Sequence, residues 1–325
     1  MNYRPFGKTG FDVSEISFGA WALGGGWGPQ SDDDSVRALH RAIDLGVNLI
    51  DTAAGYGNGR SEKVIATVLK ERRENVFVAT KTPPAPGIWP PSPYCRASER
   101  YGEAYLRANV EERLKCLGTD RLDLLQLHTW TRAWNRDPSP LAVLRQLRTE
   151  GKLQYIGVST PEHDQNSVLD LIRGGWVDVV QVIYNIFEQE PAAELLGAAR
   201  DHGVAVIVRV PFDEGSLTGK FTDKTTFADG DFRRHYFSGD RLVRTVRRVD
   251  AVRQSLEGSG LTLPQASLKF ALAHPAVSTV IPGMRNTDQV NLNCAAASLP
   301  PMTPELVEKL RPHNWRRGIW YSGKQ

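Results

Sequence analysis

Short apolar runs and helical segments alternate along almost the whole of this 325-residue chain, and this alternation restricts the fold more than any other feature. Eight runs are rich in β-branched residues, at 15–18, 47–51, 76–80, 122–127, 155–159, 177–182, 204–208 and 277–281. A segment with helical periodicity follows each run, and the run at 204–208 is apolar on both faces, as buried parallel strands are. Eight such units in one chain predict an α/β fold of the (β/α)8 barrel type.

The spacing of these units favours one domain over residues 1–325. Most strands follow one another at intervals of roughly 22 to 33 residues, close to the size of a β-α-β unit. Two units are longer, because residues 83–100 and 212–240 are inserted after the third and seventh strands. On a barrel, both insertions form long loops over the C-terminal face, where active sites lie. The residues before the first strand are expected to begin with a β-hairpin at the opposite end.

The composition and charge of the chain exclude several other classes of protein. Lys and Arg number 40 against 37 Asp and Glu, so the formal net charge is only +3 and no basic tract is dense enough to bind nucleic acid. No apolar run approaches the length of a membrane span. The first residues lack the apolar stretch of a signal peptide, and 3 cysteines are too few for a disulfide framework or a zinc knuckle. We expect a cytoplasmic protein without a metal, and its oligomeric state stays open.

Reactive polar side chains follow three neighbouring predicted strands. Asp51 and Tyr56 come at the end of the second strand, Lys81 at the end of the third and His128 at the end of the fourth. Each alone has a plain structural explanation, as a turn residue, a loop aromatic, a solvated strand end or a polar core residue. Strand ends of a parallel barrel meet at one face, so the four groups together indicate one catalytic site.

The motifs around these residues resemble the signature of the aldo-keto reductases. The resemblance rests on residues 51–57 (Asp-Thr-Ala-Ala-Gly-Tyr-Gly), 59–62 (Gly-Arg-Ser-Glu), 117–128, 151–159 and 281–285, together with Lys81, Gln289 and Asn293. These motifs stand in the family's order and cover nearly the whole chain. The resemblance implies a (β/α)8 barrel that transfers a hydride between NADP(H) and a small carbonyl or alcohol substrate, such as an aldehyde, a ketone or a sugar.

The resemblance also implies a role for each of the four polar groups. Tyr56 is the expected general acid and base, and a free phenol titrates at about 10, so it needs a positive charge beside it. Lys81 can supply that charge, and Asp51 can pair with Lys81 and hold it in place. His128 can donate a hydrogen bond that orients the carbonyl oxygen.

The other strand ends are expected to bind the cofactor. Ser159 and Gln181 match positions that hold the nicotinamide carboxamide, and Arg209 stands where many members stack an aromatic ring on the nicotinamide. Arg285 follows the eighth strand, where a cation beside backbone N–H groups suits the 2′-phosphate of NADP(H). The remaining positions belong to the segment that covers the pyrophosphate and to the turn and helix that meet the adenosine: Leu217, Lys220, Gly283, Gln289 and Asn293.

Tryptophans on the predicted C-terminal loops, Trp27, Trp89 and Trp130, are expected to form an apolar substrate pocket. Two other functions stay open at this point. Lys81 could form a Schiff base in an aldolase, which needs no nucleotide site. The chain could also be a regulatory subunit that binds NADPH with little turnover, although the complete set of four catalytic groups argues against it. The physiological substrate and the direction of the reaction are open as well.

Overall fold

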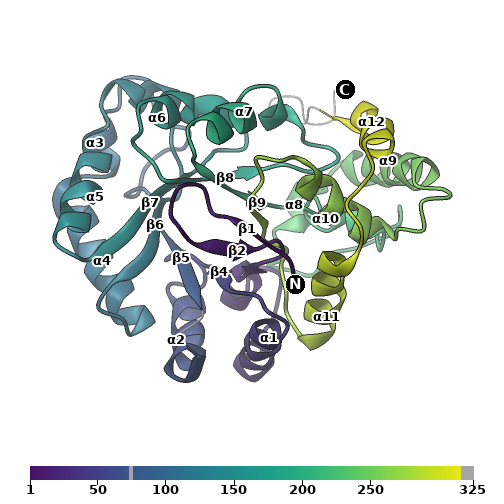
Figure 1. Cartoon of the computed structure of the whole chain (residues 1–325), viewed down its shortest axis with the longest axis horizontal. Helices are drawn as coiled ribbons and strands as arrows, with labels where there is room; N and C mark the ends of the chain where they lie inside the picture. Colours follow the sequence, from purple (N-terminus) through teal and green to yellow (C-terminus); the bar gives the residue numbers. More distant parts are fainter. Residues whose placement is uncertain (73–75, 316–325) are drawn as a thin grey trace.

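In a computed structural model that describes residues 1–72 and 76–315, eight parallel strands form one strongly curled sheet in sequence order (Figure 1). The strands are β3 (Phe18–Gly19), β4 (Leu49–Asp51), β5 (Phe77–Thr82), β6 (Leu122–Leu127), β7 (Leu153–Ser159), β8 (Val179–Ile183), β9 (Ala205–Arg209) and β10 (Thr279–Val280). Isolated parallel bridges pair Ile16 with Val280 and Gly19 with Gly283, and so connect the first strand to the last. The predicted (β/α)8 barrel is confirmed.

The seam between the first and last strands requires a residue without a side chain. A Cβ atom at Gly19 would lie 2.6 Å from the carbonyl oxygen of Ile281, so the two backbones can approach only because this residue is glycine. The strands at the seam are also shorter than the apolar runs at 15–18 and 277–281 predict. Only part of each apolar run makes regular ladder hydrogen bonds there.

Helices lie between successive strands on the outside of the barrel (Figure 1). They are α1 (Asp32–Asp44), α2 (Arg60–Arg72), α4 (Glu103–Leu117), α5 (Ser139–Thr149), α6 (Leu169–Arg173), α7 (Leu195–Asp201), α10 (Leu263–Ala273) and α11 (Thr287–Ala295). Local signals set their ends: Ser31 caps α1 by accepting a hydrogen bond from the Asp34 N–H, and Gly118 ends α4 with a left-handed φ of 65°.

Alternate residues of the strands face two separate cores. Inward-facing Leu49, Ala79 and Leu124 pack inside the barrel, whereas Ile50 and Leu125 pack outward against the helices. The same alternation continues to the strand ends, where the inward positions change from apolar to polar. This change places the polar side chains of the site on top of the barrel core.

An antiparallel hairpin closes the opposite end of the barrel, as the sequence predicts. Its strands are β1 (Tyr3–Pro5) and β2 (Asp12–Ser14), and Figure 1 shows it across the centre of the barrel. Phe6 and Val13 are fully buried in the inner core together with Phe77, the first residue of β5.

The two insertions lie on the C-terminal side of the barrel. The first contains α3 (Ala97–Arg100), the second contains α8 (Arg233–Tyr236) and leads into α9 (Arg241–Ser255), and α12 (Pro304–Leu310) follows near the end. Single turns of 3-10 helix complete the elements: η1 (Trp21–Gly24), η3 (Arg132–Arg136), η4 (Gln165–Val168), η5 (Glu190–Ala192), η6 (Ser216–Thr218), η7 (Ala296–Ser298) and η8 (Arg311–His313). Within the described part of the chain, every helix is too short or too polar to cross a membrane.

Candidate active site

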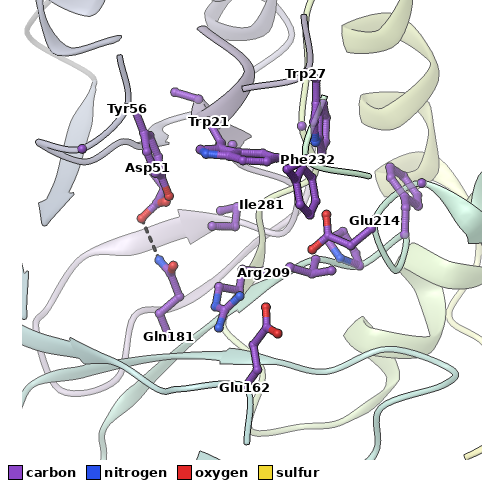
Figure 2. A pocket seen from close by; sticks show the side chains of 18 of the residues that line it. Trp21, Trp27, Asp51, Tyr56, Glu162, Gln181, Arg209, Glu214, Phe232 and Ile281 are labelled. Atoms are coloured by element: carbon purple, nitrogen blue, oxygen red, sulfur yellow. Dashed lines mark hydrogen bonds between the residues drawn. The ribbon is translucent and has the colours of Figure 1, made fainter. Parts of the chain in front are cut away.

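Asp51 and Lys81 form a buried ion pair at the ends of the adjacent strands β4 and β5. Lys81 Nζ donates to Asp51 Oδ1 at 2.5 Å and to the carbonyl oxygen of Thr52 at 2.9 Å. Asp51 Oδ2 accepts from Gln181 Nε2 at 2.7 Å (Figure 2). The same oxygen accepts from Gln126 Nε2 at 3.2 Å. The ammonium is fully buried and Asp51 is only 2% exposed, so each charge depends on these few partners for its solvation.

Tyr56 lies in the turn after β4, with its hydroxyl oxygen 3.3 Å from Lys81 Nζ. The turn packs against the loop after β3, where a Cβ atom at Gly24 would come 2.6 Å from the Tyr56 backbone. Burial raises the pKa of the Tyr56 phenol, and the positive charge of Lys81 opposes this shift without cancelling it. The phenol therefore keeps its proton at neutral pH, which is the form that can act as an acid.

The electrostatic balance at Lys81 favours the ammonium. Burial alone would lower its pKa, but the charge of Asp51, the Tyr56 oxygen and the hydrogen bonds to both raise the pKa above its usual value. A permanent positive charge next to the phenol stabilises the tyrosinate that remains after a proton is given away.

His128 follows β6, and its ring lies edge-on to the Tyr56 ring with the centroids 5.9 Å apart. Its backbone N–H donates to the carbonyl oxygen of Thr82 at 2.9 Å, which fixes the start of this loop. Burial, together with the positive charges of Lys81 and Arg209, lowers the pKa of His128 to about 3. The imidazole is neutral in the physiological range and can donate one hydrogen bond to an oxygen in the cavity.

These groups border a cavity of about 420 Å³ at the C-terminal end of the barrel. Its walls differ in character: the rings of Trp21, Trp27 and Phe232 gather at one side, and Arg209 and Glu162 lie across the cavity from Trp21 (Figure 2). Glu214 lies beside Phe232 (Figure 2). Among residues 1–72 and 76–315, no group of three or more His, Cys, Asp or Glu side chains could hold a metal ion.

Arg209 ends β9 and begins a strained segment. Its Nη2 atom donates to the carbonyl oxygen of Thr160 at 3.1 Å, while its buried Nε atom has no hydrogen-bond partner among the described residues. The next residue, Val210, has a positive φ of 54°, which is unfavourable for a β-branched side chain. Asn185 Nδ2 donates to the Val210 carbonyl oxygen at 2.9 Å and helps to hold this conformation. Backbone strain of this kind is concentrated at ligand sites.

A second buried ion pair lies behind the site, between the helices and the sheet. Glu62 of α2 is fully buried, accepts a hydrogen bond from Thr80 Oγ1 at 2.6 Å, and lies 3.1 Å from Arg113 Nε. Thr80 directly precedes Lys81, so this pair ties α2 and α4 to the strand that carries the ammonium. Burial raises the pKa of Glu62 to about 7.

The structure brings part of the sequence-predicted site together at the cavity. Asp51, Tyr56 and His128 line it, Lys81 lies buried beneath them, and three predicted cofactor positions and one tryptophan join them: Gln181, Arg209, Gly283 and Trp27. Other predicted cofactor residues are not part of the lining: Ser159, Leu217, Lys220, Arg285, Gln289 and Asn293.

Two predicted pocket tryptophans pack within the loops instead of lining the cavity. Trp130 is fully buried, and its Nε1 atom donates to Asn135 Oδ1 at 2.7 Å. Trp89 packs edge-on against Trp134, with their ring centroids 6.1 Å apart. The Trp89–Trp134 contact joins the first insertion to the loop after β6, whereas Trp130 packs on Trp134 within that loop.

Sequence reasoning missed several residues of the site. Gln126 could have been identified from the sequence, because it shares the inward side of β6 with Leu124 and pairs in register with Lys81. Trp21 could also have been identified, since it comes just after β3, with Ala20 between them. No sequence pattern points to Phe232, because it lies deep in a long insertion whose path only the tertiary structure defines.

The sequence model of the Aldo/keto reductase family matches residues 15–314. This chain therefore belongs to the aldo/keto reductase family. It is 30% identical to aldo-keto reductase YhdN of Bacillus subtilis, with 89% of this chain and 87% of that protein covered. It is 28% identical to the NADH-specific methylglyoxal reductase of Escherichia coli, with 92% and 94% covered. The holo form of aldo-keto reductase AKR11C1 from Bacillus halodurans superposes with a TM-score of 0.77 at 26% identity, over 97% and 96% of the two chains.

Proposed function

We propose that this protein is an NADP(H)-dependent oxidoreductase, carried by one domain, that interconverts a small aldehyde, ketone or sugar and its alcohol. The observation that carries the proposal is the 3.3 Å contact between the Tyr56 hydroxyl and the Lys81 ammonium, which Asp51 holds in position. Membership of a family with oxidoreductase relatives supports the class of reaction. A cytoplasmic location stays a prediction from the sequence.

The residues around the cavity fit a nicotinamide dinucleotide. Arg209 Nε and Trp27 Nε1 are buried donors without partners in the described residues, and oxygen atoms of a bound dinucleotide would satisfy them. When bound beside Tyr56, the nicotinamide would supply or accept the hydride. Gln181, Ser159 and Arg209 would hold the nicotinamide end. The pyrophosphate and adenosine would meet Leu217, Lys220, Gly283, Arg285, Gln289 and Asn293.

Residues of this chain would transfer the proton to the carbonyl oxygen. Neutral His128 donates a hydrogen bond to the carbonyl oxygen and orients it, and the Tyr56 hydroxyl gives its proton to the same oxygen as negative charge develops there. The Lys81 ammonium then stabilises the tyrosinate. In the oxidative direction Tyr56 must start as a tyrosinate, so its raised pKa favours reduction at neutral pH.

The test is the loss of nicotinamide absorbance when NADPH or NADH is mixed with a panel of aldehydes and ketones. Tyr56→Phe should reduce kcat by roughly 10² to 10⁴, the usual contribution of a general acid, and leave the Kd for NADPH unchanged. Tyr94→Phe is the matched control, because Tyr94 is 92% exposed. A Tyr56→Phe enzyme with near-normal kcat would refute the role of Tyr56.

The same measurements separate the two competing functions. In an aldolase the amine of Lys81 must act as a nucleophile, but Asp51 keeps it an ammonium. Borohydride reduction in the presence of substrate should therefore leave no adduct on Lys81. A regulatory subunit would bind NADPH tightly and consume none with any carbonyl compound in the panel.

A further inference from the structure

Two arginines bond to the loop that follows the first barrel strand: Arg60 Nη2 donates to the Gln30 carbonyl at 2.5 Å, and Arg285 makes three further contacts. Arg285, in the turn between β10 and α11, donates from Nε to Gln30 Oε1 at 2.9 Å, from Nη1 to the Trp27 carbonyl at 3.2 Å, and from Nη2 to the Pro29 carbonyl at 2.6 Å. Gln30 Nε2 donates in return to the Arg285 carbonyl at 2.8 Å. All three nitrogen atoms of the guanidinium are thus bonded to residues 27–30.

The fastened loop lies across the part of the cavity proposed for the adenosine half of the dinucleotide. The Trp27 ring lies against the backbone of Gly283, where a Cβ atom would come within 2.8 Å of it. Trp27 meets Trp21 edge-on at 5.1 Å between centroids, and Trp21 meets Phe232 edge-on at 4.9 Å. The Arg233 guanidinium lies 5.4 Å from the Trp27 ring. The rings therefore bridge the turn after β10 and the second insertion (Figure 2).

Two features indicate that the loop can leave this position. Trp27 Nε1 is buried without a partner in the described residues, so closure leaves a donor unsatisfied. Gly25 and Gly28 have left-handed φ angles of 88° and 90°, and a Cβ atom at Gly28 would meet no other atom within 4 Å. The segment therefore contains two residues that tolerate large backbone changes and is loosely packed at one of them.

We propose that Arg285 is a specificity-determining latch, which holds residues 25–31 over the dinucleotide groove until a 2′-phosphate replaces the loop oxygens on its guanidinium. The inference rests on the proposed function. A phosphate offers charged oxygens in the paired geometry that a guanidinium binds best, so it can compete with two carbonyls and an amide oxygen. NADH has no such group and must bind while the loop keeps Arg285. Selectivity for the phosphorylated cofactor thus includes the release of the loop, in addition to the phosphate contact.

The latch predicts a gain in NADH affinity in Arg285→Ala, where a simple phosphate-binding role predicts no change. Arg285→Ala removes the three guanidinium hydrogen bonds and leaves Gln30 bonded to Arg60 and to the backbone carbonyl of residue 285. The loop is then held less tightly, so NADH should bind about three- to tenfold more tightly than it binds the parent protein, while NADPH loses its phosphate contact. Gln30→Ala removes two of the four latch hydrogen bonds and keeps the guanidinium, so both dinucleotides should bind more tightly. Gln146→Ala, an exposed glutamine on α5, is the matched control and should change neither Kd.

A readout without cofactor makes the test independent of the proposed function. In the free protein, Arg285→Ala and Gln30→Ala should raise the acrylamide quenching of tryptophan fluorescence, and the increase should vanish in a Trp27→Phe background. Unchanged or weaker NADH binding in Arg285→Ala would overturn the latch, as would unchanged quenching in both variants. If the protein binds neither dinucleotide, the proposed function fails, and the quenching experiment still decides whether Arg285 holds the loop. Thermal melting of each variant establishes that it is folded.

Discussion

Removing the charge of Lys81 should destabilise the barrel strongly, and removing the charge of Asp51 as well should restore much of the loss. In Lys81→Met, the Asp51 carboxylate stays 2% exposed and keeps only Gln126 and Gln181 as side-chain donors. Breaking a buried ion pair on one side costs about 3 to 5 kcal/mol. We expect a loss of this size in the free energy of unfolding of Lys81→Met.

The double variant, Lys81→Met with Asp51→Asn, leaves no uncompensated charge in the barrel. The asparagine keeps an oxygen that can accept from Gln181, so the remaining loss comes from packing and from the hydrogen bond to Thr52. We expect the double variant to be at least about 2 kcal/mol more stable than the sum of the two single losses predicts.

Urea unfolding followed by circular dichroism at pH 7 measures these free energies. Lys269→Met provides a matched control, because Lys269 is also buried and donates to the Leu299 carbonyl at 2.9 Å. No carboxylate of residues 1–72 or 76–315 forms an ion pair with it, so Lys269→Met leaves no unpaired negative charge among them and should cost less than Lys81→Met. Single losses that simply add in the double variant would refute the view that Asp51 and Lys81 act as one unit. The same non-additivity is expected in turnover, where the double variant should be little slower than Lys81→Met.

Three further predictions concern other groups of the site. Arg209→Ala should weaken dinucleotide binding or slow turnover about tenfold, with partial recovery in Arg209→Tyr, whereas unchanged Kd and kcat would make Arg209 a rim charge only. The rate of reduction should stay level from pH 5 to 8 and fall only under alkaline conditions, because the pKa of His128 is about 3 and that of Tyr56 is raised; a step near pH 6.5 would contradict this. Burial raises the pKa of Glu62 from 4.5 to about 7. The protonated Glu62 carboxyl therefore contributes fully to the free energy of unfolding below pH 4.5, and this contribution is lost as the pH rises through 7. Glu62→Gln should remove about 3 kcal/mol of that pH dependence in urea unfolding, and an unchanged pH dependence would assign it to other groups.

The order of elements and much of the site could be predicted because both depend on local sequence patterns. The run at 122–127 coincides with β6, and the inward-facing ends of parallel strands must meet at one face whatever the loops do. This is why Asp51, Lys81 and His128 could be brought together from sequence alone. The same alternation of inward- and outward-facing residues along a strand would also have identified Gln126.

The rest could not be predicted because it depends on contacts between distant loops. A charged residue after the last strand suits a phosphate, yet Arg285 donates instead to residues 27–30, more than 250 positions earlier in the sequence. Likewise, no pattern indicates that Trp130 turns into the interior of its loop instead of lining the cavity, as Trp27 does. Long loops carry no periodicity that would fix the direction of their side chains.

The hairpin that closes the N-terminal end of the barrel also affects how the protein folds during its synthesis. Its contacts reach far along the chain: Lys8 N–H donates to the Gly203 carbonyl at 2.9 Å, and Asn2 Nδ2 donates to the Ala297 carbonyl at 2.9 Å. Residues 1–14 leave the ribosome long before Gly203 and Ala297 are synthesised. Phe6 and Val13 therefore lack part of their final apolar surroundings, including Ala205 and Ile207, until late in synthesis, and the hairpin can complete its packing only after β9 has been made.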